Sequence, residues 1–166
     1  MTGTYPSRSN QKLILVAAIL ASSMAFIDGT ALNVALPVLQ RSLKLDGSQL
    51  LWIVNGYTLF LASLILIGGS LGDVYGKKKI FIIGIVLFTV FSMVCGLAPS
   101  GNFLIISRCL QGVGGALMVP GSLAIITASF PQDERGKAIG TWSMFSAFTT
   151  IFGPVLGGYL AEAGLW

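Results

Sequence analysis

Long runs of apolar residues, separated by short polar connections, dominate the pattern of this chain. Five runs cover residues 13–36, 50–69, 80–97, 103–130 and 139–161. An α-helix needs about 20 residues to cross the roughly 30 Å of hydrocarbon in a bilayer. The length of each run is close to or above this value. Lipid offers no partners to backbone N–H and C=O groups, so a helix, which satisfies them internally, is the expected form. The pattern predicts an all-α, polytopic transmembrane bundle of about five spans.

Composition agrees with helices in lipid. Of the 166 residues, 54% are hydrophobic and only 10% are charged, whereas a soluble domain has about 25% charged residues. A transmembrane β-barrel would show segments of about 10 residues that alternate between apolar and polar, and none of the runs alternates. The sequence therefore excludes a soluble globular domain and disfavours a barrel.

The same composition argues against nucleic-acid binding, metal or cofactor sites and enzymatic activity. The formal net charge of +4 does not indicate a nucleic-acid partner, because the basic residues form no stripe with interleaved aromatic residues. Neither a metal site nor another cofactor is expected, since the chain has no histidine and its two cysteines, Cys95 and Cys109, lie apart within apolar runs. An enzyme is the least expected class, because no nucleophile stands beside a base.

The distribution of lysine and arginine predicts the orientation of the chain. If residues 1–12 are a cytoplasmic tail, one side of the membrane holds seven of these residues and the other side two, Arg41 and Lys44. This excess predicts a cytoplasmic N-terminus. A cleaved secretory signal is the alternative for the first basic and apolar residues, but the apolar run continues to Leu36. The seven residues are Arg8, Lys12, Lys77, Lys78, Lys79, Arg135 and Lys137.

The predicted connections are short. They cover residues 37–49, 72–79, 98–102 and 131–137, and connections of this length make consecutive helices antiparallel neighbours. They leave no room for a soluble catalytic domain.

Two charged residues lie within the predicted spans. Asp28 is roughly 12 Å from the outer end of the first span, and Arg108 is roughly 8 Å from the outer end of the fourth, at 1.5 Å per residue. The two side chains reach similar depth if their helices line one cavity. Because a charge in hydrocarbon costs a few kcal/mol or more, either they form a structural ion pair, or Asp28 binds and releases a proton while Arg108 adjusts its proton affinity. The residues alone leave both interpretations open.

Four segments together resemble the major facilitator superfamily, specifically its fourteen-span drug:proton antiporter branch. Residues 69–79 (GSLGDVYGKKK) resemble the signature loop between spans two and three, and residues 108–116 (RCLQGVGGA) the span-four motif with its arginine. Residues 153–158 (GPVLGG) resemble the antiporter motif of span five, and residues 28–37 (DGTALNVALP) the span-one signature of the drug exporters. All four occur in the expected order.

The chain departs from the family pattern at two positions. Val74 stands where the loop between spans two and three usually has an arginine, and Thr149 stands where the span-five motif usually has a leading glycine. The first difference weakens any charge relay that the arginine serves in the family.

The resemblance implies roles for particular residues. Asp28 and Arg108 become candidates for proton coupling in the export of small lipophilic compounds or drugs. The candidates for a conformational gate are Gly69, Asp73, Gly76, Lys77 and Lys78. The candidates for an interface helix that limits leakage are Gly153, Pro154, Gly157 and Gly158.

The resemblance also implies that residues 13–166 are spans one to five of the N-terminal half of a transporter. Family members of this kind have twelve or fourteen spans, and alternating access requires two bundles that rock around a central site. We therefore expect a partial chain that does not transport without its C-terminal half, with membrane lipid, protons and a small-molecule substrate as the partners of the full-length form. A solute importer on the same fold, or a non-transporting membrane fragment or assembly partner, remains the alternative.

Overall fold

The computed structural model describes residues 5–162, and the side chains of residues 5–159. Five long helices make up nearly all of this part, and no strand occurs in it. All five are long and apolar enough to cross a membrane. They are α1 (Arg8–Ser42), α2 (Gly47–Tyr75), α3 (Lys77–Gly96), α4 (Gly101–Ser129) and α5 (Gln132–Glu162).

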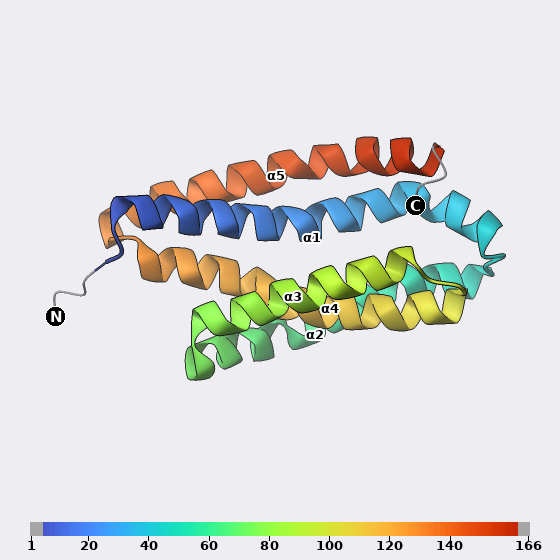
Figure 1. Ribbon diagram of the computed structural model, residues 1–166, viewed down its shortest axis with the longest axis horizontal. Coiled ribbons are helices and arrows are strands. Elements are labelled where there is room, and N and C mark those ends of the chain that lie inside the picture. Colours follow the sequence, from blue (N-terminus) through green and yellow to red (C-terminus); the bar gives the residue numbers. More distant parts are fainter. Residues whose placement is uncertain (1–4, 163–166) are drawn as a thin grey trace.

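The helices run back and forth along one common direction (Figure 1). The start of α1, the α2–α3 connection and the α4–α5 connection lie at one end of the bundle, called here the N-terminal end. The α1–α2 and α3–α4 connections lie at the opposite end. The seven lysine and arginine residues that are predicted to share one side of the membrane thus lie at the N-terminal end, while Arg41 and Lys44 lie at the opposite end.

Two groups of helices form the bundle. In one group α4 packs against both α2 and α3, and in the other α1 packs against α5. The contact between α1 and α4 joins the two groups. Large apolar side chains are exposed on every helix, among them Leu20, Leu66, Val86, Ile106 and Val155, as expected for surfaces that face hydrocarbon.

The glycines of α5 allow it to lie close against α1. A Cβ atom on Gly157 would stand 2.6 Å from the carbonyl oxygen of Ala31, and one on Gly153 would stand 3.1 Å from that of Ile27. Small residues four apart on one helix face permit this kind of backbone approach in membranes. Gly153 and Gly157 therefore position α1 against α5.

The helices extend beyond the predicted apolar runs, so the predicted connections are too long. Pro37 lies inside α1, and only Gly76 separates α2 from α3. Side chains cap three of the helices: Ser7 accepts a hydrogen bond from the N–H of Asn10, Ser100 from that of Phe103, and Asp46 forms a capping box with Gln49. Caps and the positive φ of 99° at Gly76, rather than the ends of the apolar runs, decide where the helices end.

Candidate functional site

Asp28 and Arg108 form a buried ion pair between α1 and α4. The Nη1 atom of Arg108 lies 2.6 Å from the Oδ2 atom of Asp28. The side chain of Arg108 is 3% exposed and that of Asp28 is 19% exposed. The sequence placed both residues at similar depth, and the structure joins them directly.

Gln111 completes a ring of hydrogen bonds with these two residues. Its Nε2 atom donates to Oδ1 of Asp28 at 2.8 Å, and its Oε1 atom accepts from Nη1 of Arg108 at 2.7 Å. Gln111 is fully buried. Both oxygens of the carboxylate thus have a donor, one from Arg108 and the other from Gln111.

Helix α2 holds the other side of the guanidinium. The Nε atom of Arg108 donates to the backbone carbonyl of Ile53 at 3.3 Å, and the guanidinium lies over the ring of Tyr57, 4.4 Å from its centre. The ring face attracts a cation. Gly112 makes the approach possible, because a Cβ atom there would stand 2.5 Å from the carbonyl oxygen of Tyr57. Arg108 therefore connects α4 with both α1 and α2.

Sequence reasoning named neither Gln111 nor Tyr57 as a site residue. A signal for Gln111 was present, because residues three apart lie on the same helix face and an amide in an apolar span requires a partner. Tyr57 gave no such signal, since nothing in the local pattern of α2 indicates which face meets Arg108.

The gate candidates lie at the N-terminal end of the bundle, apart from the ion pair. Asp73 and Lys77 face each other across the α2–α3 turn with 3.6 Å between Oδ1 and Nζ, and the Asp73 side chain is 73% exposed. Lys78 is exposed as well. A Cβ atom on Gly69 or Gly76 would meet no described atom within 4 Å. Within this chain these residues leave a surface open rather than pack against another helix.

The residues of the span-five motif lie in two different environments. Gly153 and Gly157 are buried against α1, whereas Pro154 is exposed. A Cβ atom on Gly158 would make only an ordinary contact, 3.7 Å from Cγ1 of Val34. Among the described residues, the close packing of this motif is therefore directed at α1.

A second polar cluster joins α1, α4 and α5 nearer the N-terminal end. The hydroxyl groups of Ser22 and Ser122 lie 3.1 Å apart, and the indole Nε1 of Trp142 donates to Oγ of Ser22 at 3.0 Å. The hydroxyl groups of Ser23 and Thr149 form a further link at 3.1 Å. Interhelical hydrogen bonds of this kind hold transmembrane helices together, and the cluster has no charged member.

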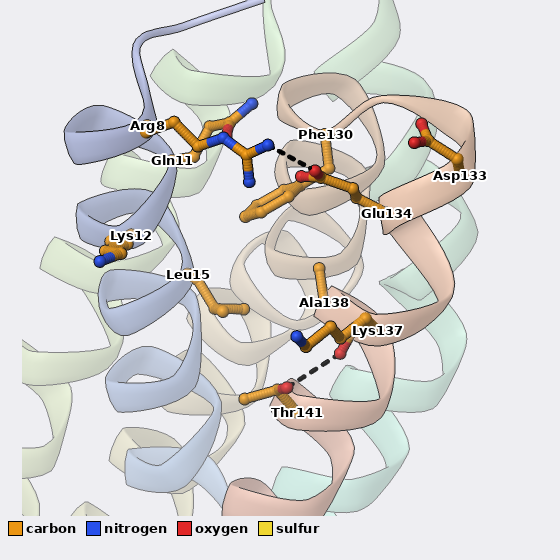
Figure 2. A pocket seen from close by; sticks show the side chains of 10 residues that line it. All are labelled: Arg8, Gln11, Lys12, Leu15, Phe130, Asp133, Glu134, Lys137, Ala138 and Thr141. Carbon is orange, nitrogen blue, oxygen red and sulfur yellow. Dashed lines mark hydrogen bonds and ion pairs between the residues drawn. The ribbon is translucent and has the colours of Figure 1, made fainter.

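A cavity of about 340 Å³ lies at the N-terminal end between α1, α4 and α5 (Figure 2). Arg8 and Glu134 form an ion pair of 2.8 Å at its edge, and Gln11 donates to the carbonyl oxygen of Ser129 at 3.0 Å. Because the Arg8 side chain is 82% exposed, water screens the pair and its contribution to stability is small. The buried hydrogen bond of Gln11 therefore holds α1 to the end of α4 more firmly than the exposed ion pair holds α1 to α5.

Comparisons with known proteins agree on one family. The sequence profile of the Major Facilitator Superfamily matches residues 18–166. The chain is 41% identical over 157 residues to the multidrug resistance protein Stp of Mycobacterium tuberculosis (strain CDC 1551 / Oshkosh), a match that covers 94% of this chain and 29% of that protein. It is 37% identical over 157 residues to the methyl viologen resistance protein SmvA of Salmonella typhimurium (strain 14028s / SGSC 2262), which covers 94% of this chain and 32% of that protein.

The fold has a close counterpart among solved structures. A bacterial homologue of the human lysosomal transporter Spinster, in an inward-facing and unoccupied conformation, superposes with a TM-score of 0.81 at 25% identity. The match covers 96% of this chain and 36% of that structure. The chain thus spans about a third of the length of the proteins that it resembles.

Proposed function

Because the chain belongs to the major facilitator superfamily, we propose that it forms the N-terminal part of a proton-coupled transporter that exports small lipophilic compounds or drugs. The observation that carries the proposal is the ion pair between Asp28 and Arg108 inside the apolar bundle. Ionisable residues at membrane depth are expensive and mark ion or proton paths. Here one carboxyl oxygen contacts a cation whose side chain is 3% exposed, while the side chain of Asp28 is 19% exposed.

The ion pair gives the two protonation states of Asp28 different structures. The ionised carboxylate holds Arg108 and therefore ties α1 to α4. A proton from water converts the carboxylate to a neutral acid, and the attraction to the guanidinium is lost. Loss of the proton to the other side of the membrane restores the pair. Proton binding on one side and release on the other thus drive a change in how α1 contacts α4.

The proposed cargo follows from the relatives. One is named a multidrug resistance protein and another a methyl viologen resistance protein, and methyl viologen is an organic cation. Because fold alone does not determine substrate, the cargo class rests on these names. Small lipophilic compounds or drugs, and organic cations, are the class that we propose for this chain.

The remaining helices of the transporter are the proposed partner of this chain. Alternating access needs a second bundle that rocks against the first, and the matched relatives are about three times longer than the segment they share with this chain. The open surface around Gly69, Asp73 and Gly76 then faces the second bundle as a gate, together with Lys77 and Lys78. We place the N-terminal end in the cytoplasm on the basis of its seven lysine and arginine residues.

The test uses the complete transporter in inside-out membrane vesicles. Asp28→Asn is expected to abolish methyl viologen uptake driven by an acidic vesicle interior, because the amide cannot take up the transported proton. Exchange of labelled for unlabelled substrate without a pH gradient should persist. Asp46→Asn is the matched control, since Asp46 is exposed at the start of α2 and asparagine caps a helix equally well.

Two results would reject the proposal. Full pH-driven uptake in Asp28→Asn would remove Asp28 from the coupling. Substrate movement that follows the proton gradient in the same direction would indicate an importer instead.

A further inference from the structure

We propose that Gln111 is a positioning residue that transmits the protonation state of Asp28 to Arg108 by turning its amide over. This inference rests on the proposed role of Asp28 in proton coupling. In this proposal the hydrogen bonds of Gln111 change when Asp28 is protonated, whereas purely structural hydrogen bonds would stay the same.

The ring of hydrogen bonds permits only one orientation of the amide while Asp28 is ionised. A carboxylate only accepts hydrogen bonds and a guanidinium only donates them. The Nε2 group must therefore face Oδ1 of Asp28, at 2.8 Å, and Oε1 must face Nη1 of Arg108, at 2.7 Å. The amide matches both partners only because it carries a donor and an acceptor.

Protonation reverses this match. Arg108 and Gln111 each donate to one carboxyl oxygen of Asp28, so a proton that binds Oδ1 meets the N–H group of Gln111. The amide then turns over, and its oxygen accepts the new O–H group. Its NH₂ group now faces Nη1 of Arg108, where two donors oppose each other. The hydrogen bond between Gln111 and Arg108 is lost.

The consequence is that Arg108 loses its link to α1 and keeps only its contacts with α2. One proton removes both the attraction of Asp28 for the guanidinium and the acceptor that Gln111 offered. The bond to the carbonyl oxygen of Ile53 and the contact with the ring of Tyr57 remain, and both lie on α2. If the Gln111 amide kept its present orientation, protonation would weaken the ion pair but leave Arg108 hydrogen-bonded to Oε1 of Gln111.

Few other ionisable groups near the ion pair compete with Asp28 for the proton. Tyr57 of α2, Cys95 of α3 and Cys109 of α4 surround the pair, and all three are uncharged as phenol and thiols. The Sγ atom of Cys95 contacts Oε1 of Gln111 at 3.6 Å, a weak bond that does not hinder rotation. Helix α5 carries no Asp, Glu, Lys, Arg, His, Cys or Tyr residue between positions 138 and 158.

The experiment follows Asp28 and the helices separately in the 166-residue chain in lipid nanodiscs. Infrared spectroscopy with ¹³C-labelled aspartate follows protonation of Asp28, and the Asp28→Asn spectrum assigns the band. Spin labels at Val34→Cys on α1 and Ile106→Cys on α4, both exposed positions, report the helix distance, with Cys95 and Cys109 replaced by alanine. In the parent chain, the two pH midpoints should coincide.

Gln111→Met keeps the length of the side chain and removes both hydrogen bonds. We expect that Asp28 still binds and releases a proton in this variant. The change in helix distance is either lost, or its pH midpoint differs from that of Asp28 protonation by about one pH unit or more, which is a tenfold change in proton affinity. Gln111→Asn, one methylene shorter, reaches only one partner and should separate the midpoints as well, so it serves if the methionine variant does not fold. Gln40→Met, at an exposed site on α1, should behave as the parent chain.

Coincident midpoints in both Gln111 variants would overturn the role of Gln111 and leave the proposed function intact. If Asp28 does not titrate in the parent chain, or if Asp28→Asn retains pH-driven export in the complete transporter, the proposed function itself fails and the role of Gln111 fails with it.

Discussion

At the scale of single residues, the ion pair joins two positions that lie 80 residues apart in the chain. Arg108 is almost fully enclosed and contacts three helices: Asp28 on α1, the Ile53 carbonyl on α2 and Gln111 on its own helix. A charge with this many partners is stable in an apolar bundle only as long as each partner stays in place. This dependence makes the pair sensitive to the loss of any one partner.

Removal of the cation should therefore destabilise the chain more than removal of the pair. For Arg108→Met in detergent we expect the free energy of unfolding to fall by about 3–5 kcal/mol, because the Asp28 carboxylate is left largely buried without a cation. Adding Asp28→Asn should recover stability, with an interaction energy of about 0.5–3 kcal/mol in a double-mutant cycle followed by circular dichroism. Strictly additive effects of the two substitutions would contradict the pair.

At the scale of helices, close backbone contact rather than side-chain volume joins α5 to α1. Gly157 lies against the backbone of Ala31, whereas Gly158, the next residue, has space around it. Both glycines are inside the same helix, so the gain in helix propensity on replacement by alanine is the same for each. The pair of positions therefore separates packing from propensity.

Gly157→Ala should lower the free energy of unfolding by about 1–3 kcal/mol, the usual penalty for an added group in a well-packed contact. Gly158→Ala should leave it unchanged or raise it by up to about 1 kcal/mol. Thermal unfolding of the two variants, side by side in one detergent, provides the measurement. Equal melting temperatures would show that α5 does not rest on α1 at Gly157.

At the scale of the whole molecule, the arrangement divides all lysine and arginine residues except Arg108 between two ends. Seven surround the N-terminal end, while Arg41 and Lys44 lie at the opposite end, where α1 finishes and α2 has not yet begun. Helices that cross the bundle in alternate directions produce this separation without any long connection (Figure 1).

The proposed orientation is open to a labelling test in cells. In a chain with Cys95 and Cys109 replaced by alanine, a cysteine at exposed Ser48 should react with an impermeant maleimide added outside intact cells. A cysteine at exposed Ser9 should react only after permeabilisation. The reverse pattern would place the N-terminal end outside and contradict the cytoplasmic assignment.

The accuracy of prediction differs from one feature to another. The number and class of the helices followed from the apolar runs, since lipid penalises every unsatisfied backbone group. The helix ends did not, because caps such as Asp46 and the turn at Gly76 act on a few local hydrogen bonds that hydropathy does not record. Asp28 and Arg108 stood out as charges in apolar runs, whereas Tyr57 looked like any other aromatic residue of a span.

The sequence by itself determined that five helices would cross a membrane, that two of them would carry opposite charges at similar depth, and to which family the motifs belong. These properties depend on residue type and spacing along a single helix. Only the tertiary structure decided that Asp28, Arg108 and Gln111 form one ring and that Tyr57 and Ile53 support it. Those contacts depend on how far each helix rotates and slides against its neighbours, which glycines such as Gly112 and Gly157 determine through backbone contact between distant segments.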